Sequence, residues 1–156
     1  MKAVVQRAKN ASVKVENAVT GSIGSGLLVY LGVARDDSEK DAEWMADKVA
    51  NLRIFEDDQG KMNLSLLDII AKNKSADTVI GVLAVSQFTL IADAAKGRRP
   101  YYGEAADPEK ANLLYECFMK KIRERGLVCE AGVFQAHMDV TYTNDGPVTI
   151  ILASPT

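Results

Sequence analysis

Histidine and cysteine are scarce in this sequence. Its 156 residues include one histidine, His137, and two cysteines, Cys117 and Cys129. A zinc site of the Cys/His type takes about four ligands, so such a site is excluded. Two cysteines are also too few to predict a small secreted fold held by disulfides. The sequence therefore implies no metal and no other cofactor.

A large excess of charge and a long hydrophobic run are missing as well. The 19 Lys and Arg and 21 Asp and Glu give a formal net charge of −2, whereas a nucleic-acid-binding domain is normally clearly basic. The uncharged apolar stretch at residues 79–92 is shorter than the roughly 20 residues of a membrane span. The apolar start, residues 3–5, is too short for a signal peptide. We expect a cytoplasmic protein with reduced thiols and no membrane contact.

Short apolar runs between turn residues predict a chain rich in β-strands. The run at 27–31 and the β-branched run at 78–87 are apolar enough to be buried on both faces. Turn residues at 144–147 are expected to join the last two strands, and a break at Gly132 is left open. The strands are expected at residues 1–8, 12–16, 19–23, 27–31, 53–55, 62–64, 78–87, 128–143 and 148–152.

Two segments have the spacing of amphipathic helices. The first follows the capping residues 36–38 and runs to about Leu52, and the second begins at Asp107-Pro108 and ends at Gly126. Residues 71–77 and 94–107 are expected to be loops, and a loop as long as the second is uncommon unless it binds something. We expect a single domain over residues 1–156, of mixed α and β class. Its largely antiparallel or mixed sheets should form a barrel-like core with the two main helices packed outside.

The common catalytic motifs are absent, and the remaining candidates are ambiguous. There is no phosphate-binding loop, no Gly-x-Ser-x-Gly elbow and no His-Glu-x-x-His. Residues 86–89, Ser-Gln-Phe-Thr, end a buried strand, but the hydroxyl of Ser86 or Thr89 would need an adjacent base to act as a nucleophile. A strand end with a capping hydroxyl is the alternative. Arg7 either points inward and needs a partner or is solvated.

Taken together, the motifs make the sequence similar to the D-aminoacyl-tRNA deacylases over nearly its whole length. The resemblance rests on five short motifs in this order. They are Val5-Gln6-Arg7, Gly60-Lys61-Met62-Asn63, Ser86-Gln87-Phe88-Thr89-Leu90, Arg99-Pro100 and Asn144-Asp145-Gly146-Pro147-Val148-Thr149.

The resemblance implies a cytoplasmic homodimer that hydrolyses the ester joining a D-amino acid to the 3′ end of tRNA. It implies that Gly146 and Pro147, joined by a cis peptide bond, enter the partner subunit's active site and present carbonyls to the substrate's amino group. Arg7 would lock this motif, and Met62 and Asn63 would belong to the substrate-binding residues.

The same resemblance assigns the catalytic pocket to Ser86, Gln87, Phe88 and Thr89. Backbone N–H groups near Phe88 and Thr89 would polarise the ester carbonyl, and the terminal 2′-hydroxyl of the tRNA would help to activate water. A steric filter of this kind should reject L-amino acids and also admit glycine mischarged on tRNA(Ala). Beside the pocket, Lys96, Arg98 and Arg99 are the candidate tRNA-binding residues.

Three other interpretations stay open. Thr89 is a covalent nucleophile in one, the chain is a small esterase using Ser86 or Thr89 in the second, and it is a nucleic-acid-binding module without catalysis in the third. The loop at 71–77 and the tail at 153–156 look longer than in compact bacterial members, but neither contains a motif.

Overall fold

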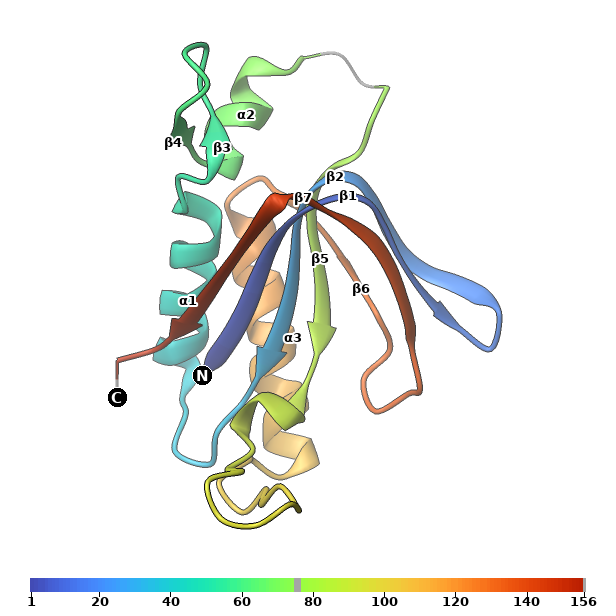
Figure 1. Cartoon of the computed structure of the whole chain (residues 1–156), viewed down its shortest axis with the longest axis vertical. Helices are drawn as coiled ribbons and strands as arrows, with labels where there is room; N and C mark the ends of the chain where they lie inside the picture. The colour runs from blue at the N-terminus through green and yellow to red at the C-terminus, as the bar shows by residue number, and fades with distance from the viewer. Residues whose placement is uncertain (75–76, 156) are drawn as a thin grey trace.

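The computed structural model describes residues 1–74 and 77–155. Its main sheet has five strands in the order β6-β5-β2-β1-β7, antiparallel from β2 to β7 and parallel from β2 to β6. The strands are β1 (Lys2–Val15), β2 (Ala18–Gly32), β5 (Ile80–Ser86), β6 (Val128–Ala131) and β7 (Asp139–Ala153). Because β6 and β7 are the two edges of the described sheet, the expected barrel-like core is wrong: the sheet is open, although it is strongly bent (Figure 1).

Two long helices cover one face of this sheet, as the sequence predicts (Figure 1). Helix α1 (Glu39–Asn51) begins with a capping box between Ser38 and Asp41, and α3 (Pro108–Glu124) is capped by Asp107. Their apolar stripes pack with alternate strand residues into the main core. Its largest fully buried side chains include Leu27, Leu31, Met45, Leu66, Leu114, Phe118 and Ile122.

The other face of the sheet carries a smaller apolar cluster. Leu28, Leu83 and Val85 are buried there, and Tyr30 and Tyr142 pack against them. The run at 27–31 is buried because its residues alternate between this cluster and the helical side. The prediction of a strand covered on both faces is confirmed.

A small two-stranded sheet and a short helix lie at one end of the molecule. The expected hairpin is present as β3 (Phe55–Glu56) and β4 (Met62–Leu64), and a short helix that the sequence reading missed, α2 (Leu66–Lys72), follows it (Figure 1). The loop predicted at 71–77 therefore begins two residues later in the structure, at residue 73, since residues 71–72 complete α2. Residues 75–76 of that loop, and Thr156 of the tail, lie outside the described residues.

The final strands differ from expectation. Residues 144–147 do not turn the chain back. Strand β7 continues through them, and it pairs with β1 both up to Asn144 and again from Thr149. The predicted strand 128–143 is instead interrupted after β6 by residues 132–138, so the break at Gly132 is confirmed. No described helix is both long and apolar enough to cross a membrane.

Candidate functional site

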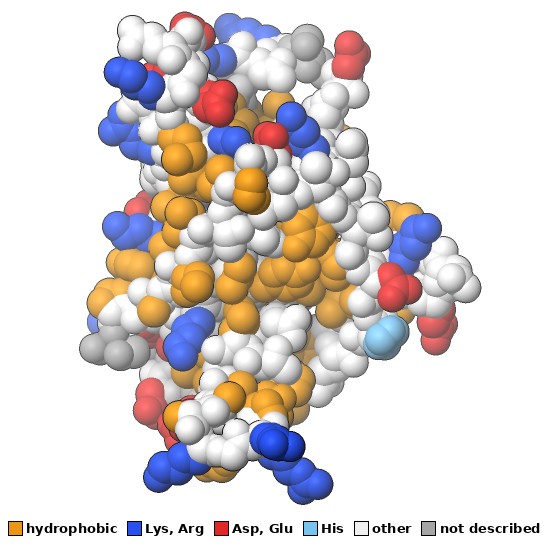
Figure 2. All heavy atoms as spheres, in the orientation of Figure 1, with side chains coloured by type: hydrophobic (Ala, Val, Ile, Leu, Met, Phe, Trp, Pro, Cys, Tyr) orange, Lys and Arg blue, Asp and Glu red, His pale blue; other side chains and the backbone are white. Residues whose placement is uncertain are grey.

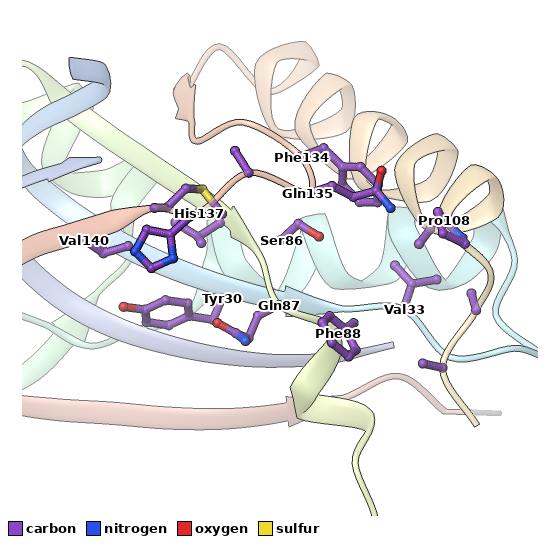
Figure 3. A pocket seen from close by; sticks show the side chains of 16 residues that line it. Tyr30, Val33, Ser86, Gln87, Phe88, Pro108, Phe134, Gln135, His137 and Val140 are labelled. Atoms are coloured by element: carbon purple, nitrogen blue, oxygen red, sulfur yellow. The ribbon is translucent and has the colours of Figure 1, made fainter. Parts of the chain in front are cut away.

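A pocket of about 570 Å³ opens where β5 ends (Figure 3). Ser86, Gln87 and Phe88 form one wall, and the start of α3 and the segment before β7 form the others. The remaining lining residues are Tyr30, Val33, Val85, Ala105, Ala106, Pro108, Ala111, Phe134, Gln135, Ala136, His137, Met138 and Val140. Most of these side chains are apolar, which suits a site that binds a small or planar group away from water.

The chain leaves the sheet at Gln87, and this exit frees two backbone donors. The Gln87 N–H still donates to the carbonyl of Leu31 on β2, at 2.8 Å. The short 3₁₀ turn η1 (Phe88–Ile91) follows, and its first internal bonds are made by Leu90 and Ala92. Within the described residues, the N–H groups of Phe88 and Thr89 have no acceptor. Two adjacent free N–H groups beside a pocket are suited to binding a carbonyl oxygen or an oxyanion.

Thr89, which was expected in the pocket, is exposed and does not line it, and no described hydroxyl at the end of β5 is arranged for nucleophilic catalysis. The Thr89 hydroxyl accepts a hydrogen bond from the Gln87 side chain, and neither it nor the Ser86 hydroxyl has a bond to a described histidine or carboxylate. His137 is 96% exposed at its side chain and lies 3.9 Å from Asp139. Burial raises the pKa of Tyr30 to about 12, with Tyr142 adding to the shift, so this phenol stays protonated near neutrality. No described cluster of three or more His, Cys, Asp or Glu could hold a metal.

Gly146 and Pro147 lie in a bulge of β7. Gln6 pairs with Thr149 and Ala8 with Asn144, so four residues of β7 face the single residue Arg7 of β1. The Gly146–Pro147 peptide bond is cis, and Gly146 has a φ of +139°, which favours glycine. Both residues are exposed, and neither lines the pocket of its own chain.

Arg7 is the inward arginine that the sequence left undecided. It is buried, and its Nε donates to the carbonyl of Asp145 at 3.0 Å while Nη1 donates to that of Ile54 at 2.7 Å. The Asp145 carboxylate lies 3.4 Å from the same Nε. Arg7 thus joins the bulge to the chain just before β3, which is the kind of partner that a buried guanidinium needs.

The other candidates from the sequence fall into two separate places. Met62 and Asn63 lie exposed on β4, where Arg53 donates to the Asn63 carbonyl at 2.8 Å, and they do not line the pocket. Lys96, Arg98 and Arg99 are exposed in the segment 93–105, which we call the basic loop. Figure 2 shows Lys and Arg side chains projecting at the end of the molecule where Figure 1 draws this loop.

One wall of the pocket was missed by sequence reasoning. Residues 134–138 line it, with Phe134 and Met138 partly buried in the apolar clusters. The sequence reading assigned this segment to a strand because polar and apolar residues alternate in it. Gln135 has a φ of +63°, which interrupts a strand and was the feature that alternation could not reveal.

The family model "D-Tyr-tRNA(Tyr) deacylase" matches residues 4–153, and this match places the chain among ester hydrolases that act on aminoacyl-tRNA. The chain belongs to this family, the D-aminoacyl-tRNA deacylases. It is 54% identical over 154 residues to the D-aminoacyl-tRNA deacylase of Thermotoga petrophila and 56% identical to that of Kosmotoga olearia. Each alignment covers 99% of this chain and 97% of the relative.

Two solved structures are similar to the whole chain. One, described as "c-Myc DNA Unwinding Element Binding Protein", has 40% sequence identity and a TM-score of 0.88, with all of both chains covered. The other is described as a "probable eukaryotic D-amino acid tRNA deacylase". It is 16% identical with a TM-score of 0.79 over 97% of each chain, and at this identity it shows the shared fold alone.

Proposed function

We propose that the chain cleaves the ester of D-aminoacyl-tRNA to free D-amino acid and tRNA, and also cleaves glycine mischarged on tRNA(Ala). The observation that carries this proposal is the pair of free N–H groups at Phe88 and Thr89 beside an apolar pocket. They would bind the ester carbonyl and stabilise the oxyanion that forms when water attacks it. Removing donors of this kind raises a reaction barrier by about 3–4 kcal/mol.

The chiral filter belongs to the partner subunit in this proposal. Gly146 and Pro147 are exposed and absent from their own chain's pocket, which supports insertion into a second copy. Their carbonyls would hold the substrate's amino group while the N–H groups hold its carbonyl. The Cα is then fixed, so that a D side chain points to open space and an L side chain collides with Pro147. Glycine has nothing to reject and is cleaved.

Arg7 would support this insertion, and Met62 and Asn63 would contribute to substrate binding and chiral selection. Arg7 holds the bulge through the Asp145 carbonyl, and it also lies near Glu56 of β3. Strand β4 pairs with β3 and carries Met62 and Asn63. Met62 is 57% exposed, which suits a side chain that a partner covers. Lys96, Arg98 and Arg99 would contact the tRNA near its 3′ end, in a cytoplasmic homodimer.

Catalysis without a protein base is the mechanism that this site favours. The pocket lacks a base next to a hydroxyl, so the terminal 2′-hydroxyl of the tRNA would activate the attacking water. Replacing the terminal adenosine by its 2′-deoxy form should then abolish turnover by the unmodified protein. Hydrolysis of the 2′-deoxy substrate at the normal rate would contradict this step.

A covalent mechanism through Thr89 is the alternative for the same reaction. Thr89 already accepts a hydrogen bond from Gln87 and has no described base beside it. We expect Thr89→Ala to retain most of the activity on D-tyrosyl-tRNA, with circular dichroism to verify its fold. Complete loss of activity in a folded Thr89→Ala protein would favour the nucleophile.

A nucleic-acid-binding module without catalysis is the second candidate function. It is favoured by one observation, the 40% identity to a structure described as a DNA-unwinding-element-binding protein. Incubating the purified chain with D-tyrosyl-tRNA separates the two functions. Release of D-tyrosine supports the hydrolase, and binding without release supports the module.

A further inference from the structure

The basic loop combines exposed cations with an exposed aromatic ring. Lys96, Arg98 and Arg99 are solvent-exposed, and none of them forms an ion pair with a described residue. Tyr101 follows them and is 61% exposed. Cations next to an accessible aromatic ring are the combination by which proteins bind single-stranded nucleic acid.

The ring of Tyr101 is supported by the backbone of Gly103. A Cβ atom at position 103 would lie 1.9 Å from the Tyr101 hydroxyl oxygen and 2.1 Å from its Cζ. Any side chain there would displace the ring, so the position of the ring depends on the absence of a Cβ atom at 103. The ring therefore rests on the chain while much of its surface remains open to solvent.

Several contacts fix the loop relative to the pocket. The Arg35 guanidinium donates to the Gly103 carbonyl, and the Arg35 N–H donates to the carbonyl of Glu104 at 2.8 Å. Tyr101 exchanges two backbone hydrogen bonds with Asp93, at 2.8 and 2.9 Å. The neighbouring Tyr102 ring contacts the ring of Phe88 at a centroid distance of 5.1 Å. Phe88 lines the pocket, as does Ala105 of the basic loop, so the loop that holds Tyr101 borders the pocket.

We propose that Tyr101 stacks on a nucleobase of the unpaired 3′ end of tRNA while Lys96, Arg98 and Arg99 contact the phosphates beside it. The inference rests on the proposed function, because the ester that enters the pocket is attached to that single-stranded end. Stacking requires an unstacked base, which the paired acceptor stem does not offer. The ring thus distinguishes the unpaired end from the stem, and the cations bind either.

The test measures binding of two RNA minihelices, one with the unpaired 3′ tail and one without it. Tyr101→Ala should weaken binding of the tailed RNA by about 5- to 100-fold and leave the tailless RNA unchanged. Tyr101→Phe should bind like the unmodified protein. Gly103→Ala keeps the ring but displaces it, so it should weaken binding of the tailed RNA in the same direction as Tyr101→Ala.

Salt dependence separates stacking from charge. Neutralising Lys96, Arg98 and Arg99 to Gln should reduce the slope of log K against log salt by about 2, and Tyr101→Ala should leave that slope unchanged. The matched control is the same neutralisation at Lys2, Lys14 and Lys40, which lie outside the basic loop, are exposed and form no ion pair with a described residue; it should leave the slope unchanged.

Two results would overturn the inference: unchanged affinity of Tyr101→Ala for the tailed RNA, or an equal loss for both RNAs. Hydrolysis of D-tyrosyl-tRNA by the unmodified protein is measured separately. If that reaction is absent the proposed function fails, whereas the stacking inference is decided by the binding data alone.

Discussion

Arg7 illustrates how one side chain connects distant parts of the chain. Its donors reach the carbonyls of Ile54, just before β3, and of Asp145 in the bulge of β7. The sequence predicts that an inward arginine needs a partner, but the identity of both carbonyls depends on tertiary structure. Ser86, Gln87 and Phe88 were found because a buried run ends there, whereas the opposite wall at 134–138 carries no comparable signal.

Replacing Arg7 by Met tests this connection at the residue scale. The change keeps much of the apolar volume but removes donors to two carbonyls, so we expect a loss of about 2 kcal/mol in the free energy of unfolding. Deacylation should fall as well, because the bulge loses its anchor. Urea unfolding and a D-tyrosyl-tRNA assay measure the two effects.

Lys9→Met is the matched control, since Lys9 also contacts Asp145, at 3.4 Å, but its side chain is 55% exposed. An exposed ion pair contributes at most about 1 kcal/mol. If Arg7→Met were no more destabilising than Lys9→Met, the anchoring role of Arg7 would be wrong.

At the scale of elements, capping chemistry and apolar spacing predict α1 and α3 well. Helix α2 was missed although Ser65 and Asp68 form a capping box, with Ser65 N–H donating to Asp68 at 2.8 Å. Seven residues give too short an apolar pattern to stand out. The expected turn at 144–147 failed because its residue types also suit a bulge, and only pairing with β1 decides between the two.

A buried cysteine on strand β6, Cys129, leads us to expect that the stability of the fold depends on pH. Burial raises the pKa of Cys129 from 9.0 to about 12. The folded thiol therefore keeps its proton while the unfolded one loses it, so stability is full below pH 9 and declines as the pH rises toward 12. The decline attributable to this group is about 1.4 kcal/mol per pH unit.

Cys129→Ala should be less stable near neutrality, because a buried side chain is lost, yet its stability should fall less steeply above pH 9. Urea unfolding of both proteins under reducing conditions measures the two slopes. Parallel pH profiles would show that the Cys129 thiol ionises equally in the folded and unfolded chains.

At the scale of the whole molecule, the mixed α and β class was predictable from the sequence. Whether the sheet closes into a barrel was not. Strand propensities do not specify which strands become edges, and here β6 and β7 remain unpaired on one side within the described sheet. The sequence contains both the Gly146-Pro147 motif and the pocket residues, but it does not show that the motif lies outside the pocket of its own chain. Their separation is what makes a second subunit necessary in the proposed mechanism.

Mixing two inactive variants tests whether the site is shared between subunits. In Gly146→Ala the new Cβ would lie 2.8 Å from Val148 Cγ2 at a φ of +139°, so the bulge must shift. Phe88→Ala alters the pocket. If each site combines one chain's pocket with its partner's bulge, refolding the two together at equal amounts should restore about a quarter of the activity of the unmodified protein.

Gly126→Ala is the control for backbone strain alone, because Gly126 has a φ of +79° and nothing within 4 Å of its Cβ position. It should lose about 1 kcal/mol of stability and keep its activity. Activity in the mixture no greater than that of the separate variants would mean that each site takes its pocket and its bulge from the same chain.

The central claim is that backbone geometry, and not a side-chain base, selects and cleaves the D-ester. The most direct measurement is the rate of ester hydrolysis of D-tyrosyl-tRNA and L-tyrosyl-tRNA by the same purified protein, with glycyl-tRNA as a third substrate. The account predicts rapid cleavage of the D-ester and of glycyl-tRNA and no cleavage of the L-ester above the spontaneous rate. Equal rates on the D- and L-esters would contradict it.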